Sequence, residues 1–307
     1  MSSLQTNNVQ FRIPKIKKLD TTIIDPIPTP IPTIISSIEN NYPKITISQL
    51  DMFRIFAHLT ILFIGDNSIR TFYRDFVNLF SNGRLLKDSE ISIQNGEYKE
   101  MKCERRLQKG GKLGSSEYKD IRQYFCEASS TRLIYIYIPT VFGNIAEKNI
   151  NYLKTMKDCT SIHVVLFSLY HGDLNFAKLK KLKKLKKPLK QHLEEYDENL
   201  NNVCMHLLDI CSNKKDVHQQ KIWLSPYPPN MKLSNVEEKI LNKIIRHTNK
   251  ITGANGFKTF NRNYIWDKIH DDLLIKGSHY FSSQGIRLIT QFFAEIVGKK
   301  WHRTMPK

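Results

Sequence analysis

The spacing of hydrophobic residues changes along the chain in a way that predicts alternating strands and helices. Leu59–Ile64 is a short, dense apolar run that ends in Gly65-Asp66, a pattern typical of a buried parallel strand. From Ser68 to Leu79, apolar residues then recur with the 3.6-residue period of an amphipathic helix. This part of the chain therefore predicts a strand, a tight turn and a helix.

The same alternation continues toward the C-terminus. Further β-rich runs are predicted as strands, namely Thr131–Ile138, Ile162–Ser168 and Gln220–Ser225. Further amphipathic segments are predicted as helices, namely Asn144–Lys157, Gln191–Ile210, Val236–Ile251 and Ser282–Val297. Repeated strand–helix units form a parallel sheet with helices on both faces. We therefore expect an α/β three-layer sandwich with a parallel sheet of about five strands between helices.

Functional sites in open α/β sheets lie at the carboxyl ends of the strands. Three segments are predicted to lie there: Gly65–Ser68, Ser168–Asp173 and the residues just before Ser282. Candidate catalytic or binding side chains are therefore expected in these three segments.

The first 45 residues differ in composition from the rest of the chain. Pro26, Pro28, Pro30 and Pro32 alternate with Ile and Thr, which excludes a helix and favours extended polyproline II. We therefore expect residues 1–45 to form a flexible N-terminal extension and residues 46–307 to form one domain.

Charge adds a second feature. The chain has 47 Lys and Arg against 29 Asp and Glu, a formal net charge of +18, which favours polyanions as partners. Lys178–Lys190 contains eight of these lysines, interleaved with leucines. The lysines predicted to contact an anionic membrane or nucleic acid are Lys180, Lys181, Lys183, Lys184, Lys186 and Lys187. The alternative is a solvated insertion, in which Pro188 ends or kinks any helix.

Cysteine usage and the apolar runs bear on cofactors and compartment. The five cysteines are an odd number without a C-x-x-C pair, unlike a disulfide framework. Cys204 and Cys211 are expected to pack as small hydrophobic residues, and with His206 they have the wrong spacing for zinc. We expect no metal and no other cofactor.

Met1–Gln10 lacks the apolar core of a secretory signal, and the longest apolar runs are far shorter than a membrane helix. We therefore expect a cytoplasmic or nuclear protein without a transmembrane segment.

Several short blocks carry a family resemblance. In chain order they are Phe63–Arg70 followed by Tyr73-Arg74-Asp75, Leu107–Gly114 with its Gly110-Gly111 pair, Tyr118–Tyr124, Ile222-Trp223-Leu224 followed by Pro226, and Gly277–Tyr280 followed by a helix ending in Trp301. This ordered set, over Ile45–Trp301, resembles the GDSL/SGNH esterases and is most similar to the PC-esterase domain-containing family. The resemblance implies an SGNH-hydrolase-like fold.

The resemblance also implies acyl-transfer chemistry. In that chemistry a serine after the first strand attacks, and a histidine three residues after an aspartate acts as the base. A hydroxyl nucleophile needs a base, the imidazole needs an orienting carboxylate, and the oxyanion needs preset donors. The family's histidine corresponds to His279, and its oxyanion donors correspond to Gly110–Gly111 and, by position, to Ser168.

The chain departs from the family pattern at the reacting positions. Asn67 occupies the nucleophile position, and a carboxamide cannot serve as that nucleophile. Ser68 is adjacent, but one residue along a helix turns a side chain by about 100°. Lys276 occupies the aspartate position and would repel the imidazolium of His279. Candidate replacements for the carboxylate are Asp267, Asp271 and Asp272.

Three functions stay open at this point. The first is a PC-esterase-like domain that has lost its catalytic Ser and Asp and binds a partner or a small acyl or carbohydrate-like ligand. In this case Asn67 and Ser68 serve as helix N-cap residues. The second is an active acyl esterase or acyltransferase that uses Ser68 and His279. The third is a polyanion-binding protein that acts through Lys178–Lys190.

Overall fold

The structure is a computed structural model, and it describes residues 44–91, 98–112, 115, 117–156, 161–174, 188–212, 219–226, 233–260, 273–275 and 281–303. The chain divides into two units, Met1–Asn41 and Tyr42–Lys307, and all described residues belong to the second. The predictions for the N-terminal prolines, for Lys178–Lys187, for Lys276 and His279, and for the three candidate aspartates lie outside the described residues.

A central β-sheet has seven strands within the described residues, in the order β2-β3-β4-β1-β5-β6-β7. Five of them run parallel: β4 (Thr131–Tyr137), β1 (Thr60–Gly65), β5 (Val164–Ser168), β6 (Gln220–Leu224) and β7 (Lys258–Phe260). A hairpin of β2 (Glu104–Gly110) and β3 (Lys119–Cys126) extends the sheet, with β3 antiparallel to β4. The predicted parallel sheet is therefore confirmed, and the antiparallel hairpin is an addition to it.

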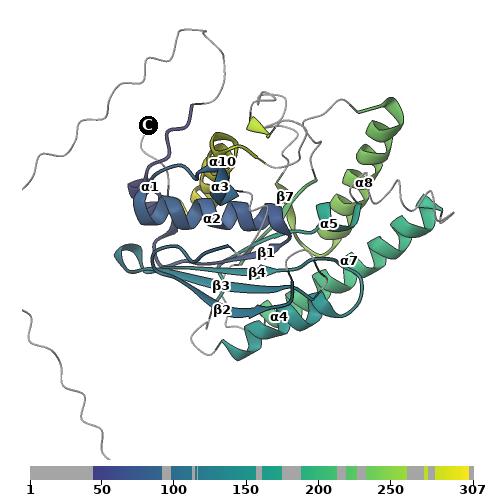
Figure 1. Cartoon of the computed structure of the whole chain (residues 1–307), viewed down its shortest axis with the longest axis horizontal. Coiled ribbons are helices and arrows are strands. Elements are labelled where there is room, and N and C mark those ends of the chain that lie inside the picture. Colours follow the sequence, from purple (N-terminus) through teal and green to yellow (C-terminus); the bar gives the residue numbers. More distant parts are fainter. Residues whose placement is uncertain are drawn as a thin grey trace, which may run out of the picture. The chain divides into compact units, whose positions relative to one another are not determined.

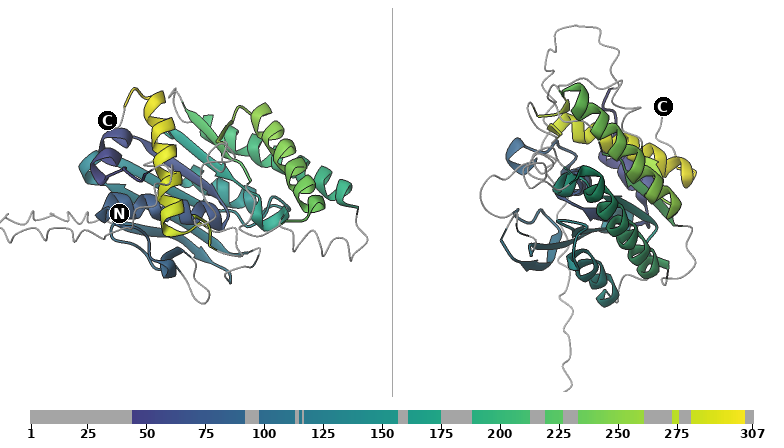
Figure 2. Two further views of the ribbon diagram at one scale, coloured as in Figure 1. Left: turned by 90° about the horizontal axis from the view of Figure 1, so that it is seen from above. Right: turned by 90° about the vertical axis from the view of Figure 1, so that its right-hand side faces the viewer.

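Helices cover both faces of this sheet (Figure 1). The first layer consists of α1 (Gln49–Phe56), α2 (Asn67–Asn82) and α10 (Ser283–Lys300). The second consists of α4 (Ile145–Thr155), α7 (Leu189–Ser212) and α8 (Asn235–Ala254). Figure 2 shows the second layer as neighbouring helices along one face of the sheet. Short helical turns are α3 (Asp88–Ile91), α5 (His171–Leu174) and the 3-10 turn Glu127–Ser129. The predicted three-layer α/β architecture is confirmed.

Each helical layer has its own hydrophobic core. Phe56, Phe63, Phe72, Phe76 and Phe293 pack against one another beneath the first layer, with ring centroids 5.1 to 6.3 Å apart. The second core contains Cys204 and Cys211, which are buried as predicted. Burial raises the pKa of the Cys204 thiol to about 12.

Local capping fixes where the helices begin. Ser48 and Asp51 form a reciprocal capping box at the start of α1, and Ser234 and Glu237 do the same for α8. The α2 helix ends at Gly83, whose φ of 72° is the left-handed conformation that glycine tolerates best.

No helix in the described ranges is both long enough and apolar enough to cross a membrane.

Candidate functional site

The tight turn after β1 brings two neighbouring strands into close contact. Gly65 pairs with Ser168 of β5, and a Cβ atom added to Gly65 would lie 2.0 Å from the Ser168 carbonyl oxygen. The φ of Gly65 is 153°, which also disfavours any residue with a side chain. Only glycine therefore fits at this point, and the next residues begin α2 directly at the carboxyl edge of the sheet.

Asp66 is the N-cap of α2, so the prediction of Asn67 and Ser68 as N-cap residues is wrong: both lie inside the first turn of the helix. Asp66 forms two hydrogen bonds with Ser68. Its Oδ1 accepts from the Ser68 backbone N–H at 2.9 Å and from the Ser68 hydroxyl at 2.7 Å. Asp66 and Ser68 are both buried, with 4% and 5% of their surface exposed. The hydroxyl of Ser68 thus stabilises the first turn of the helix, in the way that short polar side chains cap helices.

Ser168 lies next to this turn, but its hydroxyl is directed to another strand. The buried Ser168 Oγ donates to the Leu224 carbonyl oxygen of β6 at 2.9 Å. This hydrogen bond links the ends of β5 and β6. The Ser168 hydroxyl proton is therefore used within the sheet.

Gly110 and Gly111 lie at the same edge of the sheet, at the end of β2. Strand β2 runs parallel to β1 but is separated from it by β3 and β4, a spacing of roughly 14 Å at 4.8 Å per strand. Gly111 has a φ of 68°, and a Cβ added to it would lie 2.5 Å from the Glu117 carbonyl oxygen. The sheet therefore brings Asn67, Ser68 and Ser168 together, and it places the glycine pair farther along the same edge.

A pocket of about 340 Å³ lies elsewhere, between the loop after β4 and helices α4 and α7. Its polar lining includes Glu147, Asn199 and His206. None of the predicted site residues lines it.

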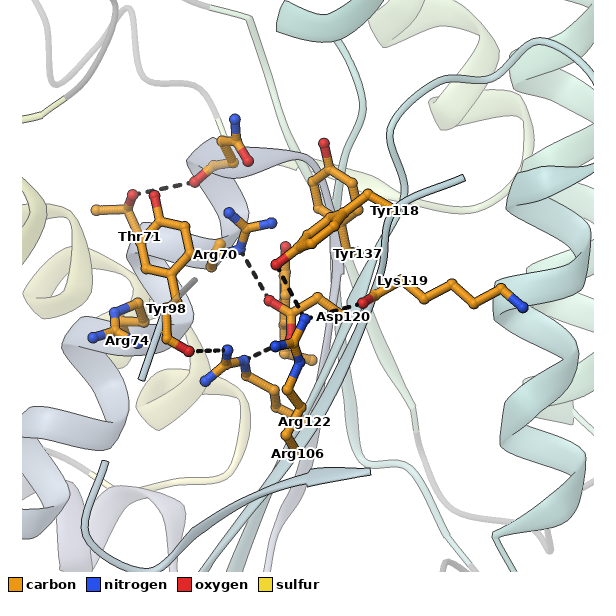
Figure 3. A network of polar contacts seen from close by, with 12 residues as sticks. Arg70, Thr71, Arg74, Tyr98, Arg106, Tyr118, Lys119, Asp120, Arg122 and Tyr137 are labelled. Atoms are coloured by element: carbon orange, nitrogen blue, oxygen red, sulfur yellow. Dashed lines mark hydrogen bonds and ion pairs between the residues drawn. The ribbon is translucent and has the colours of Figure 1, made fainter. Parts of the chain in front are cut away.

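Within the described residues, the strongest concentration of buried charge surrounds Arg70, a residue of α2 two positions after Ser68. Arg70 is 1% exposed. Its Cζ atom lies 4.4 Å from the ring centroid of Tyr98, 4.7 Å from that of Tyr137 and 5.5 Å from that of Tyr118. Figure 3 shows the Arg70 guanidinium between Tyr98 on one side and Tyr118 and Tyr137 on the other. Such contacts between a cation and aromatic faces are favourable, more so when water is excluded.

Asp120 of β3 is the anion that three guanidinium groups share. Its Oδ1 lies 2.7 Å from Arg122 Nε and 3.0 Å from Arg106 Nε, and its Oδ2 lies 3.4 Å from Arg70 Nε. Arg122 also pairs with Glu104 of β2 at 3.1 Å. All of these side chains are almost completely buried. We call Arg70, Arg74, Arg106, Arg122, Asp120 and Glu104 the arginine cluster.

Burial would lower the pKa of the Arg70 guanidinium, but nearby Tyr135 and Asp120 outweigh this effect and the pKa is raised. Burial also raises the pKa of the Tyr135 hydroxyl well above its usual value. Arg70 is therefore a permanent cation.

Sequence analysis placed Arg70, Tyr118, Asp120 and Arg122 in blocks of family resemblance but did not predict that they meet. The signal that could have indicated it is the alternation Tyr118-x-Asp120-x-Arg122-x-Tyr124. Alternate residues of a strand share one face. Asp120 and Arg122 therefore lie on the same face of β3, and both charges need partners there if that face is buried.

Comparison with known proteins gives structural similarity alone. No family model matches the sequence, and no curated protein matches it. Among solved structures, the acetylxylan esterase Axe2 from Geobacillus stearothermophilus is 14% identical with a TM-score of 0.44, and the match covers 82% of this chain and all of Axe2. A protein from Parabacteroides merdae described as a GDSL-like lipase is 11% identical with a TM-score of 0.44, and the match covers 83% of this chain and 100% of that one. The α/β hydrolase LAE5, from the metagenome of Lake Arreo in Spain, is 15% identical with a TM-score of 0.41, and the match covers 80% of this chain and 98% of LAE5.

Proposed function

We propose that this chain is an SGNH-like α/β domain that has lost ester hydrolysis and acts as a binding module. Its ligand would be a small acyl or carbohydrate-like molecule at the carboxyl edge of the sheet. The proposal starts from the resemblance of the sequence blocks to the PC-esterase family, in which Asn67 stands at the nucleophile position and Lys276 at the position of the acid.

The observation that carries the proposal is the hydrogen bond from the Ser68 hydroxyl to Asp66. In the chemistry that the family resemblance implies, a serine nucleophile gives its proton to a histidine, and a carboxylate stabilises the imidazolium that forms. Ser68 instead donates to a carboxylate that already caps the same helix, at 2.7 Å and away from solvent. An attack by Ser68 would have to break this hydrogen bond first.

Ser168 supports the same conclusion. An oxyanion hole requires donors that point at the developing charge before the reaction begins. The Ser168 hydroxyl donates to Leu224 within the sheet, so it offers no free proton to a bound oxyanion. Neither the nucleophile nor this oxyanion donor is set for acyl transfer.

The test is hydrolysis of p-nitrophenyl acetate by the full-length chain and by Ser68→Ala. We expect the two rates to be equal and close to that of buffer. Ser81→Ala is the matched control, because Ser81 lies on the same helix and donates to the Val77 carbonyl oxygen at 2.6 Å. Turnover by the wild-type chain that Ser68→Ala abolishes and Ser81→Ala preserves would overturn the proposal in favour of an active esterase.

A gain-of-function variant tests the other half of the proposal, that the scaffold is retained. In Asn67→Ser with Lys276→Asp, both reacting positions carry the residues that the family pattern requires. We expect this double variant to hydrolyse the ester at a rate above that of Asn67→Ser alone, because the base needs its orienting carboxylate. Equal rates for the single and double variants would contradict an SGNH-like arrangement.

A further inference from the structure

Arg70 is a buried cation with unused hydrogen-bond donors. Within the described residues, its Nε, Nη1 and Nη2 atoms are all buried and none has a hydrogen-bond acceptor. The nearest carboxylate oxygen, Asp120 Oδ2, lies 3.4 Å from Nε in an ion pair. Buried polar groups in proteins are almost always hydrogen-bonded, so an unsatisfied guanidinium requires an explanation.

Two neighbouring arginines, Arg122 and Arg74, do not share this property. Arg122 donates to Asp120 and Glu104 and to the Tyr98 carbonyl oxygen. Arg74 donates to the carbonyl oxygens of Glu90 and Lys99 at 3.2 Å each. Burial alone therefore does not account for the unused donors, because the same region supplies acceptors to the other guanidinium groups.

The charge balance of the arginine cluster points in the same direction. Within the described residues, four guanidinium groups, Arg70, Arg74, Arg106 and Arg122, lie near three carboxylates, Asp120, Glu104 and, beside Arg74, Glu90. A buried charge without a partner destabilises the folded state. An added anion would reduce the excess positive charge and would supply the acceptors that Arg70 lacks.

The geometry defines which anion fits. In Figure 3 two nitrogens of Arg70 point away from Asp120, toward the space between the ring of Tyr98 and the rings of Tyr118 and Tyr137. A guanidinium edge with two N–H groups matches two oxygens on one atom, as in a carboxylate or a phosphate group. Tyr98 and Tyr137 are 8% and 5% exposed, whereas Tyr118 and Tyr135 are fully buried. A ligand would therefore reach Arg70 past Tyr98 and Tyr137.

We propose that Arg70 recognises the carboxylate or phosphate group of a ligand by a bidentate hydrogen bond, with Tyr98 and Tyr137 flanking the bound group. The inference rests on the proposed function as a binding module and adds the chemical class of the ligand. It assigns Arg70 a recognition role that does not depend on Ser68.

The test measures thermal unfolding of the full chain in sodium phosphate, in sodium acetate and in sodium chloride at equal ionic strength. A ligand that binds only the folded state raises Tm in proportion to the logarithm of its concentration above Kd. We expect phosphate or acetate to raise Tm above its value in chloride. The anion that gives the larger increase in Tm identifies the preferred group. Equal Tm values in all three salts would overturn the inference.

Three variants locate the effect. Arg70→Met should lose the anion response, and its Tm in chloride should be no lower than that of the wild type, because the variant no longer buries an unsatisfied cation. Arg70→Lys keeps the positive charge but lacks the two adjacent N–H groups of the guanidinium, so it should bind the anion at least tenfold more weakly. This variant remains informative if Arg70→Met fails to fold. Arg132→Met is the matched control and should keep the response, because Arg132 also lies over an aromatic ring, that of Phe125, but is outside the arginine cluster. An equal response in all variants would show a general salt effect and contradict the inference.

These outcomes are separate from those of the hydrolysis assay. Ester turnover that depends on Ser68, together with an anion response that depends on Arg70, would overturn the proposed function and leave the anion site in place. Absence of both would leave the loss of catalysis in place and remove the anion site.

Discussion

Arg287 of α10 forms a buried, bidentate ion pair with Asp75 of α2. Arg287 Nε lies 3.0 Å from Asp75 Oδ2, Arg287 Nη2 lies 3.0 Å from Asp75 Oδ1, and 212 positions separate the two residues in sequence. Arg287 also donates to the carbonyl oxygens of Gly83 and Arg84 at the end of α2. The pair fixes the register of the C-terminal helix against the helix that begins at the candidate site.

We expect Asp75→Asn to destabilise the fold by about 3 kcal/mol, because removal of one partner leaves the Arg287 charge buried and unpaired. The measurement is the midpoint of urea unfolding. Thr290→Val is the control, since Thr290 donates one hydrogen bond to Asp75 Oδ2 at 2.7 Å and its loss should cost about 1 kcal/mol. Equal losses for the two variants would contradict a dominant role for the ion pair.

The Arg84–Glu90 pair predicts a specific acid dependence of stability. Hydrogen bonds from Arg84, opposed in part by burial, lower the pKa of the Glu90 carboxyl from 4.5 to about 2. Because the folded-state pKa is depressed, the stabilisation is present above pH 4.5 and is lost as the pH falls toward 2. The pair is partly exposed, with 41% and 24% of the two side chains accessible, so we expect about 1 kcal/mol or less.

The check is urea unfolding of the wild type and of Glu90→Gln at pH 6 and at pH 3. The wild type should exceed the variant in stability at pH 6, and the difference should shrink at pH 3. A difference that stays constant between the two pH values would show that Glu90 does not titrate in this way.

The cysteines should differ in reactivity according to burial. Cys103 is exposed, whereas Cys126, Cys204 and Cys211 are buried. With a pKa of about 12 for Cys204, about one molecule in ten thousand carries the thiolate at pH 8. In a Cys159→Ser background, we expect one thiol to react rapidly with Ellman's reagent and the other three to react only after unfolding. Rapid modification of Cys204, located by mass spectrometry, would contradict the packing described for α7.

The lysine-rich segment remains a separate prediction. If Lys178–Lys190 binds an anionic surface, affinity should fall steeply with salt. Changing its lysines to glutamine should weaken binding to both liposomes and nucleic acid, whereas changing Leu179, Leu182, Leu185 and Leu189 to serine should weaken liposome binding alone. Liposomes containing phosphatidylserine and a duplex DNA are the two probes. Unchanged binding in both variants at physiological salt would leave the segment as a solvated insertion.

The sequence predicted the strands that form the centre of the sheet and missed those at its edges. Runs such as Leu59–Ile64 and Ile162–Ser168 are apolar on both faces, which only a strand between two helical layers needs. The β2–β3 hairpin gives no such signal, because Glu104, Asp120 and Arg122 occupy the face that packs against α2. Charged residues usually face solvent, and only the ion pairs across the hairpin make the burial of these three possible.

The candidate site shows the same division between local and distant information. The position of Asn67 and Ser68 at the start of α2 follows from the apolar run, the glycine and the helical period, all within twenty residues. The hydrogen bond of Ser168 to Leu224 and the contact of Arg70 with Tyr98 depend on strand order and loop position. A single sequence carries no direct information about either.

Covalent labelling with a fluorophosphonate tests most directly the central claim that the Ser68 hydroxyl is bound to Asp66, the N-cap of α2, and does not act as a nucleophile. An activated serine forms an oxygen–phosphorus bond with this reagent and releases fluoride, and intact mass spectrometry detects the adduct. The account predicts that the full-length chain gains no mass, because the Ser68 hydroxyl is buried and bound to Asp66. One adduct per chain, mapped to Ser68 and absent in Ser68→Ala, would contradict it.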